Sequence, residues 1–300
     1  MRRKAGNLTN TMRFSIVIPV HNGEQTIARA IRSCLDQTYH NFEVIVVDNA
    51  STDNTAQAVR GVQDKRVGSV YTPTAGRSHA RNLGLSLSTG EFILFLDADD
   101  ELAPQAMASF NRALERHPQC DAVQCATSYI LPDGGVRIVR PFCPTQHYYS
   151  KLHVRNTVPI NSMAIARELC GTFPEDTEFC EDWLFWLRSL RTATIHVLQE
   201  TNAIVHIHRE NTSQDKQAMK CNEIPVYLEF LADHLPLSFS IRRAAAMAIA
   251  LATYAHAGKI QRVENSLARH QGCAMIVRTL RRYRWLGDPF RSYIRRRYGF

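Results

Sequence analysis

The chain has 300 residues, 45% of them hydrophobic, and its formal net charge of +8 favours an anionic partner such as a nucleotide, an acidic lipid surface or nucleic acid. This length and composition allow one substantial core and exclude a largely disordered protein. We expect a flexible N-terminus over residues 1–12. We expect a cytoplasmic protein without a membrane-spanning helix, because the first segment lacks the apolar run of a secretory signal and no apolar stretch approaches the ~20 residues that span a bilayer.

The first part of the chain alternates buried-strand patterns with amphipathic helix patterns, which is typical of βαβ units around a parallel sheet. The strands that we predict cover Phe14 to Val20, Glu43 to Val47, Val67 to Tyr71 and Phe92 to Leu96. Helical spacing predicts helices over Glu24 to Asp36, Arg77 to Leu87, and Pro104 to about Arg116.

Beyond Asp121 the pattern changes. Ala122 to Leu131 and Val136 to Val139 flank a Pro-Asp-Gly-Gly turn, which predicts a hairpin and antiparallel strands joining the sheet. From Leu228 the chain favours helix, and arginines interleaved with aromatic residues gather near its end, at Arg278, Arg281, Arg282, Arg284, Arg291, Arg295, Arg296 and Arg297. This basic helical segment is either a solvated surface or a docking surface for an anionic membrane.

Three polar clusters follow predicted strand ends, where ligands bind in open α/β sheets: Pro19 to Glu24, Asp48 to Asp53, and Asp97 to Asp100. Asp97 and Asp99 lie two apart, so in an extended segment both carboxylates can face one divalent cation and a diphosphate. The alternative is an Asp-rich turn that caps the next helix. Asp48 could accept a hydrogen bond from the imide of a uracil, or it could form an Asx turn.

Other nucleotide sites are disfavoured. The sequence has neither a G-x-G-x-x-G fingerprint after its first strand nor a G-x-x-x-x-G-K-S/T motif, which argues against dinucleotide oxidoreductases and P-loop NTPases. The eight cysteines have no C-x-x-C spacing and are expected to be reduced thiols. If a nucleotide binds, metal and arginine must neutralise its diphosphate, and Arg77 and Arg81 are near enough in sequence to help.

The stretches FSIVIPVHNGEQTIARAIRSCLDQTYHNFEVIVVDNASTDNT and GRSHARNLGLSLSTGEFILFLDADDELAP resemble the N-terminal half of family-two inverting glycosyltransferases of the bacterial polysaccharide type. The resemblance is close over residues 13–130 and looser to about 215. It implies the GT-A fold, a Rossmann-like α/β architecture with a mixed, mostly parallel sheet flanked by helices. The catalytic domain would cover 13–225, with a nucleotide-binding half over 13–121 and an acceptor half over 122–225, followed by a basic helical extension over 226–300.

The resemblance also implies roles for individual residues. His21 and its neighbours would line the nucleoside pocket, Asp48 would contact the base, and Asp97 would lie on the nucleotide side of the diphosphate. His21 stands where the family most often has tyrosine. The expected nucleotide-sugar-binding residues are Pro19, His21, Glu24, Asp48, Arg77, Arg81, Asp97 and Ala98.

Metal binding and proton transfer are assigned in the same way. Asp99 would hold a Mn²⁺ or Mg²⁺ ion, and Asp100 would orient its neighbours. An inverting transfer needs a general base, and Glu181-Asp182 resembles the family's Glu-Asp pair at the start of a helix, so Asp182 is the candidate base. Its alternative role is compensation of the helix dipole. His208 is the candidate second metal ligand, against the alternative of a structural histidine.

These expectations combine into one function. We expect the chain to move a single sugar from a nucleotide diphosphate sugar, a UDP-sugar, to a saccharide or lipid-linked acceptor with inversion, in the synthesis of cell-surface polysaccharide or glycoconjugate. The alternatives are a nucleotidyltransferase or a glycoside hydrolase, an inactive nucleotide-sugar or glycan-binding relative, and a nucleic-acid-binding protein that uses the arginine-rich end of the chain. The basic helices suggest a peripheral position on the inner face of the cytoplasmic membrane, and no nucleic-acid partner is expected.

Overall fold

The computed structural model describes residues 11–141, 148–177, 179–208, 215–230 and 237–298. Contacts group the chain into two compact units. The sheet unit comprises residues 1–146, 157–175 and 188–208, and the helical unit comprises residues 147–156, 176–187 and 209–300. This grouping takes three segments of the expected catalytic domain (147–156, 176–187 and 209–225) into the helical unit, and the division at residue 225 stays a prediction.

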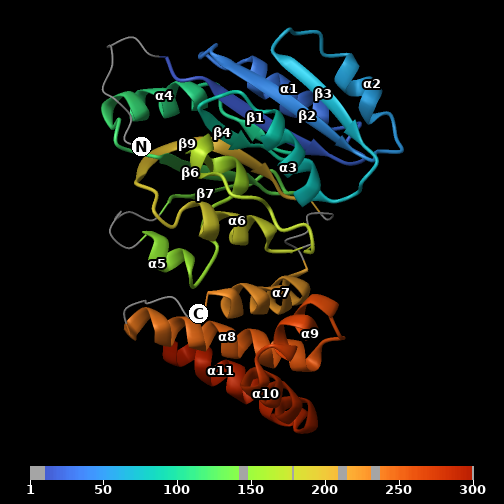
Figure 1. Cartoon of the computed structure of the whole chain (residues 1–300), viewed down its shortest axis with the longest axis vertical. Coiled ribbons are helices and arrows are strands. Elements are labelled where there is room, and N and C mark those ends of the chain that lie inside the picture. The colour runs from blue at the N-terminus through green and yellow to red at the C-terminus, as the bar shows by residue number, and fades with distance from the viewer. Residues whose placement is uncertain (1–10, 142–147, 178, 209–214, 231–236, 299–300) are drawn as a thin grey trace. The chain divides into compact units, whose positions relative to one another are not determined.

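The first half of the sheet is parallel. Its strands lie in the order β3-β2-β1-β4, with each neighbouring pair parallel (Figure 1). Their bounds are β1 Phe14–Val20, β2 Phe42–Asn49, β3 Val67–Thr72 and β4 Phe92–Phe95. The four predicted strands are therefore confirmed, and the ends of β1, β2 and β4 bring the three polar clusters to one edge.

The second half of the sheet is mixed. It continues from β4 through β8 (Met163–Ala166), β6 (Ala122–Ile130), β9 (Ile195–His206) and β5 (Glu101–Leu102), with β7 (Val136–Val139) paired to β6. Strands β6 and β7 are antiparallel, which confirms the predicted hairpin, whereas β6 and β9 are parallel. The sheet is more evenly mixed than expected, because the pairs β4–β8, β6–β8 and β5–β9 are antiparallel as well.

Helices cover both faces of the sheet. The apolar stripe of α1 (Ile27–Leu35), with α2 (Thr55–Arg60) and α4 (Ala106–Arg116), packs into the main core with one set of strand side chains, including Ile16 and Ile18. The alternate positions Ile45 and Val47 pack against α3 (Arg77–Leu87). Predicted helices began too early at Glu24 and Pro104, because both are followed by turns, the first closed by Thr26 N donating to the Gly23 carbonyl.

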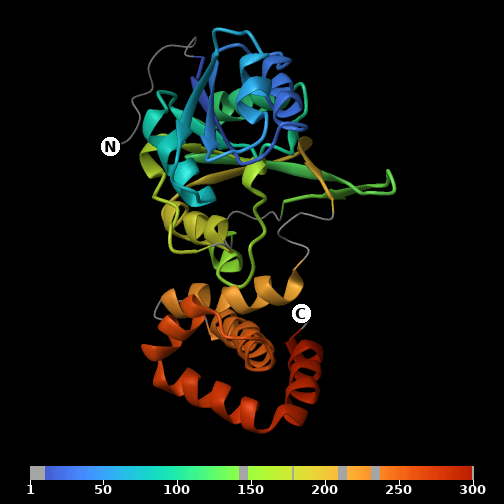
Figure 2. The same cartoon turned by 90° about the vertical axis from the view of Figure 1, so that its right-hand side faces the viewer.

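The helical unit holds the C-terminal part of the chain, shown in orange and red in Figure 2. Its helices are α5 Tyr148–Leu152, α6 Glu181–Ser189 apart from the last two residues, α7 Lys216–Glu229, α8 Leu237–His256, α9 Gln261–Ala268, α10 Gln271–Arg282 and α11 Gly287–Tyr298. The predicted helical region is confirmed and begins at Lys216, before Leu228. Within the described ranges, no helix combines the length and hydropathy needed to cross a membrane.

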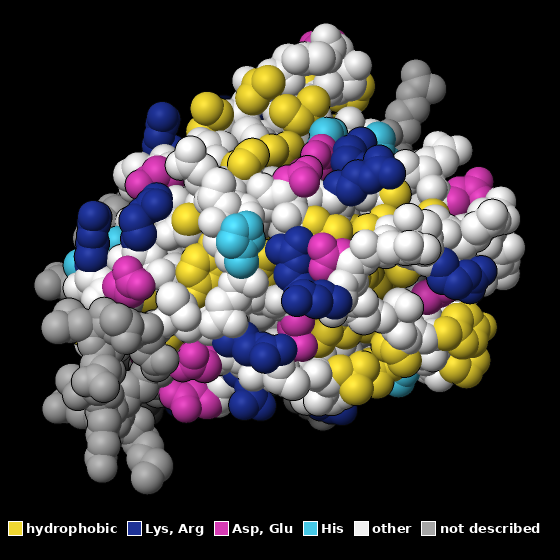
Figure 3. Space-filling view, turned by 90° about the horizontal axis from the view of Figure 1, so that it is seen from above, with side chains coloured by type: hydrophobic (Ala, Val, Ile, Leu, Met, Phe, Trp, Pro, Cys, Tyr) yellow, Lys and Arg dark blue, Asp and Glu magenta, His cyan; other side chains and the backbone are white. Residues whose placement is uncertain are grey.

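Surface charge on the sheet unit is mixed in sign. Figure 3 shows basic, acidic and histidine side chains interspersed on one face, with no broad field of a single sign there. The net positive charge of the chain is therefore not concentrated on that face, as it would be in a typical nucleic-acid footprint.

Candidate functional site

The loops after β1 and β2 are joined into one surface. His21 Nδ1 donates to the Asn49 carbonyl oxygen at 2.7 Å, and the Asn22 amide donates to Ser51 Oγ at 2.9 Å. Asn22 Oδ1 in turn accepts from the Thr52 amide at 2.8 Å. Because each loop satisfies the other's polar groups, His21 is held beside the end of β2, where Asp48 lies.

Asp48 sits on a strained strand end. Its carboxylate Oδ1 accepts from the Ser51 amide at 3.1 Å, which is the Asx turn given as its alternative role, and the residue is 7% exposed. Ala50 between them has φ 56°, a left-handed conformation that is uncommon for an alanine. Such strain gathers at functional sites. The turn fixes the orientation of the carboxylate, and base contact by Asp48 stays a prediction.

The other predicted nucleoside residues occupy varied environments. Pro19 is buried inside β1, opposite Val47 of β2, so its contribution is to shape the strand end. Glu24 is exposed, and its Oε2 accepts from the Asn54 amide at 2.9 Å. Ala98 lies next to the loop after β1. A Cβ added to Gly23 in that loop would be 3.9 Å from the Cβ of Ala98. The acidic segment after β4 therefore borders the surface made by the two loops.

Arg81 and Asp97 form a charged pair at the centre of this edge. Arg81 Nη2 lies 2.7 Å from Asp97 Oδ1, with side-chain exposures of 1% and 32%. Burial by itself raises the pKa of Asp97, but the charges of Arg81 and Arg77 and the hydrogen bond from Arg81 outweigh it, so the pKa is lowered. Asp97 is thus held as a carboxylate, and the structure brings these three predicted residues together.

Asp99 faces a histidine, as expected. His208 Nε2 lies 2.7 Å from Asp99 Oδ2, and the side chains are 43% and 31% exposed. Two residues before His208, His206 Nε2 lies 2.7 Å from Glu101 Oε1, so both histidines at the end of β9 meet carboxylates from the segment after β4. The role of His208 as a metal ligand stays a prediction.

Asp100 is buried and supports this arrangement. Its carboxylate accepts from the His206 amide at 3.0 Å and from Asn161 Nδ2 at 3.2 Å. Burial, followed by the charges of Asp97 and Asp99, raises the pKa of Asp100 well above its ordinary value. Asp100 therefore links the acidic segment to the end of β9, in line with the orienting role expected for it.

The sequence reasoning missed several residues that organise the site. Asn49 Oδ1 accepts from the Gly76 amide at 3.1 Å, which ties the start of α3 to the end of β2. Arg29 Nη2 donates to the Asp99 carbonyl oxygen at 2.6 Å, and its Nε lies 3.3 Å from Glu101 Oε1. A polar residue directly after the β2 aspartate was a signal for Asn49, whereas an arginine on an amphipathic helix gave no signal for Arg29.

Asp182 belongs to the helical unit, at the start of α6. Asn156 Nδ2 donates to Asp182 Oδ2 at 2.8 Å, and the Trp183 amide donates to Oδ1 at 2.8 Å. The preceding Cys180 has φ 61°, so a strained residue leads into the helix. Both carboxylate oxygens are thus oriented by donors, and the role of Asp182 as a base stays a prediction.

The side chains of Asp99 and His208 could supply some of the ligands of a divalent cation. A carboxylate oxygen and an imidazole nitrogen both bind Mn²⁺, and Mg²⁺ is commonly held by one or two carboxylates together with substrate phosphates. Among the residues that the structure describes, no group of three or more His, Cys, Asp or Glu side chains could hold a metal ion alone. Protein atoms would therefore supply part of the coordination, and a bound diphosphate the rest.

Sequence comparisons agree with the site. The profile of glycosyl transferase family 2 matches residues 15–168. An uncharacterized glycosyltransferase of Haemophilus influenzae is 30% identical over 68% of the chain and 82% of its own length. The poly(ribitol-phosphate) beta-N-acetylglucosaminyltransferase TarS of Staphylococcus aureus is 28% identical to this chain. The match covers 63% of this chain and 34% of TarS. The Escherichia coli UDP-Glc:alpha-D-GlcNAc-diphosphoundecaprenol beta-1,3-glucosyltransferase WfgD is 29% identical over 61% of the chain and 72% of its own.

Solved structures share the fold. The S. aureus TarS fragment in complex with UDP-GlcNAc has a TM-score of 0.64 at 19% identity, over 96% of this chain and 90% of the other. A mannosyltransferase from Pyrobaculum calidifontis in complex with GDP-Man and Mn²⁺ has a TM-score of 0.60 at 20% identity, over 95% of this chain and 86% of the other. The mixed α/β architecture expected from the sequence, the GT-A fold, is thereby confirmed.

Proposed function

Because this chain belongs to glycosyl transferase family 2 and is a glycosyltransferase, we propose that it moves a single sugar from a UDP-sugar to a saccharide or lipid-linked acceptor with inversion. The observation that carries the proposal is the meeting of Asp97 and Asp99 at one sheet edge with Arg81 and His208. A carboxylate cluster that merely capped α4 would have no need of a buried arginine or a facing histidine.

Donor binding uses the joined loops after β1 and β2. Asp48 would accept a hydrogen bond from the base and His21 would border it, while Pro19, Glu24 and Ala98 shape the surrounding surface. Arg77 and Arg81 would favour a diphosphate by their charge, since guanidinium groups bind phosphate oxygens well. The solved relative with UDP-GlcNAc supports a nucleotide sugar as the donor class.

The chemistry needs one proton acceptor and a stabilised leaving group. In our proposal the Asp182 carboxylate takes the proton of the acceptor hydroxyl as its oxygen bonds to the anomeric carbon of the donor, and the bond from that carbon to the diphosphate breaks on the opposite side. A Mn²⁺ or Mg²⁺ ion held through Asp99 and His208 would supply charge neutralisation for the departing diphosphate. Asn156 keeps the base oriented.

The acceptor class rests on the relatives. WfgD is named for a lipid-linked acceptor and TarS for a polymer acceptor. Both names support a lipid-linked or polymeric glycan as the acceptor class, and a position at the cytoplasmic face of a membrane is a further part of our proposal. We propose that helix α10 and the turn after it hold the enzyme there, because Met275 and Trp285 are 65% and 74% exposed on the same segment as the exposed Arg282 and Arg284. Exposed apolar and basic side chains on one segment are typical of interfacial helices.

The decisive experiment is a donor screen with product analysis. Purified protein would be incubated with UDP-, GDP- and dTDP-sugars, Mn²⁺ or Mg²⁺, and lipid-linked or free saccharide acceptors, and the anomeric configuration of the product would be read by NMR. We expect a glycoside of inverted configuration from a UDP-sugar, with one sugar added per acceptor. Asp182→Asn should bind the donor normally and lose 10²-fold or more in kcat.

Other outcomes would contradict the proposal in distinct ways. Free sugar without glycoside would indicate a hydrolase, and release of pyrophosphate would indicate a nucleotidyltransferase. Tight donor binding without turnover across the acceptor screen would indicate a binding relative.

A further inference from the structure

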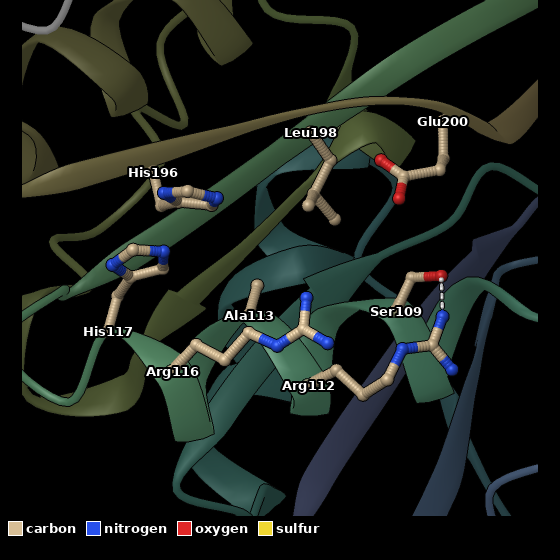
Figure 4. Close-up of a pocket in the computed structure, with 8 residues that line it drawn as sticks. All are labelled: Ser109, Arg112, Ala113, Arg116, His117, His196, Leu198 and Glu200. Atoms are coloured by element: carbon tan, nitrogen blue, oxygen red, sulfur yellow. Dashed lines mark hydrogen bonds between the residues drawn. The ribbon is translucent and has the colours of Figure 1, made fainter.

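A pocket of about 60 Å³ lies between the C-terminal half of α4 and the first half of β9. One water needs roughly 10–15 Å³ of cavity volume, so the pocket has room for a small tetrahedral anion. The acidic segment Asp97–Asp100 precedes the N-terminal end of α4, whereas the pocket lies toward the other end of that helix. Its lining residues are Ser109, Arg112, Ala113, Arg116, His117, His196, Leu198 and Glu200 (Figure 4).

The lining is predominantly basic. Arg112 and Arg116 extend from α4 toward β9, and Arg112 Nη2 donates to Ser109 Oγ at 3.0 Å (Figure 4). The structure gives neither arginine a carboxylate partner within the described residues, so both charges remain available to a ligand. Glu200 is the single carboxylate among the eight lining residues. Two guanidinium groups around a small cavity favour an oxyanion, which they can contact through several N–H donors.

The two histidines of the pocket also favour an anionic ligand. The rings of His117 and His196 are stacked, with centroids 4.1 Å apart and planes inclined by 23°. Two stacked imidazoles repel each other once both are protonated, and burial followed by the charge of His117 lowers the pKa of His196, with Glu200 acting in the opposite direction. A bound anion would offset this repulsion and let both rings donate.

We propose that this α4–β9 pocket binds a phosphoryl group, either as free phosphate or as the terminal phosphate of a larger molecule. The site lies in the sheet unit and does not use Asp48, Asp97, Asp99 or Asp182, so it stands independently of the proposed transferase activity. The four basic side chains bind the oxyanion, and the negative charge of Glu200 limits its affinity.

The test follows the imidazole signals of His117 and His196 by NMR, assigned with His117→Gln, while inorganic phosphate is added at constant ionic strength against chloride. We expect saturable shifts of both signals in the full chain. Arg116→Ala should weaken phosphate binding at least tenfold, whereas Glu200→Gln should tighten it. Arg32→Ala is the matched control, because Arg32 is also exposed in the last turn of a helix of the sheet unit.

Glycerol 3-phosphate distinguishes the source of the group: competition at similar affinity assigns the pocket to a phosphorylated molecule, and failure to compete assigns it to free phosphate. Absence of saturable shifts, or an Arg116→Ala protein that titrates like the wild type, would overturn the proposal.

Discussion

The guanidinium of Arg81 lies 2.7 Å from the carboxylate of Asp97, although only 1% of the arginine side chain is exposed. The same guanidinium lies over the ring of Phe173, 5.2 Å from its centroid. An arginine is rarely buried to this extent unless it is paired. Arg81 therefore fixes both the position and the charge of Asp97 at the sheet edge.

Replacing Arg81 by methionine should affect stability and donor binding together. Arg81→Met removes the partner of a carboxylate that is about a third exposed, so we expect a loss of roughly 1–3 kcal/mol in the free energy of unfolding, less than for a fully buried pair. Urea denaturation measures this loss, and titration with UDP and Mn²⁺ should show weaker binding. Arg77→Met, at the exposed first position of α3, should leave stability within about 0.5 kcal/mol.

Most of the nucleotide-binding half was predictable because its signals are local. The apolar run of β1 and the stripe Ile27, Ile31 and Cys34 of α1 each depend on neighbouring residues; β1 has the predicted bounds, and α1 begins three residues later than predicted. The acidic segment was placed at a strand end for the same reason. Bonds such as His208 to Asp99 join residues 109 positions apart, and the resemblance alone suggested them.

Three strands of the second half, β5, β8 and β9, escaped prediction for physical reasons. Strand β5 has two residues, too few for any period to show, and β8 is a short run of four residues, Met163–Ala166. Strand β9 mixes buried and exposed positions irregularly, and its pairing with β6 shifts register between Gln124 and Thr127. A bulged strand loses the strict alternation on which such predictions depend.

Glu43 should make stability depend on pH in the acid range. Burial alone would raise its pKa, but hydrogen bonds from Ser15 Oγ at 2.6 Å and from the Thr89 amide and hydroxyl, with the charge of Arg13, lower it. A lowered pKa in the folded state gives stability that is present above the unfolded pKa and is lost as pH falls through the folded pKa. Glu43→Gln should therefore cost about 2 kcal/mol at pH 7.

Urea titrations at pH 7, 5 and 3 measure that difference. The gap between the wild type and Glu43→Gln should narrow toward pH 3, as the wild-type carboxylate takes up a proton. Glu168→Gln changes an exposed glutamate of the same unit and should follow the wild type throughout. A gap that stays constant from pH 7 to pH 3 would rule out the carboxylate's charge as the source of stability.

Asn156 should act on catalysis through Asp182. Its amide donates to Asp182 Oδ2 at 2.8 Å, so Asn156→Ala removes one of the donors that orient this carboxylate. We expect kcat to fall about tenfold or more with little change in the donor KM, because orientation matters in the transition state more than in binding. Asn265→Ala, on α9 of the same unit, is the control. Equal changes in kcat and donor KM would point to general disturbance of the fold.

The segment from α10 to Trp285 should bind anionic vesicles. Removing two exposed charges with Arg282→Gln and Arg284→Gln should cost about 2 kcal/mol, or roughly 30-fold in partition onto phosphatidylserine-containing vesicles measured by flotation. Arg32→Gln with Arg60→Gln changes the net charge equally in the sheet unit and should leave partition unchanged. Equal losses in the two double variants would mean that net charge alone, rather than this segment, governs binding.

The contact between Asp99 and His208 can be either a metal site or a simple ion pair, and metal binding separates the two. Both side chains are partly exposed, so an ion pair would contribute only about 0–1 kcal/mol, and stability measurements would not distinguish the roles. The affinity for Mn²⁺ does distinguish the two roles. We expect Asp99→Asn and His208→Gln each to weaken Mn²⁺ binding at least tenfold in the presence of UDP, as read from the free Mn²⁺ signal by electron paramagnetic resonance.

His206→Gln is the matched control, because His206 lies two residues away and contacts a carboxylate at the same 2.7 Å distance. If His208 is a ligand, losing its imidazole removes one bond to the metal, whereas losing that of His206 disturbs only the pair with Glu101. Mn²⁺ binding should then fall in His208→Gln and persist in His206→Gln, with UDP binding in the absence of metal unchanged in both. Equal Mn²⁺ affinity in the two histidine variants would remove His208 from the metal site and leave Asp99 with the diphosphate as the expected ligands.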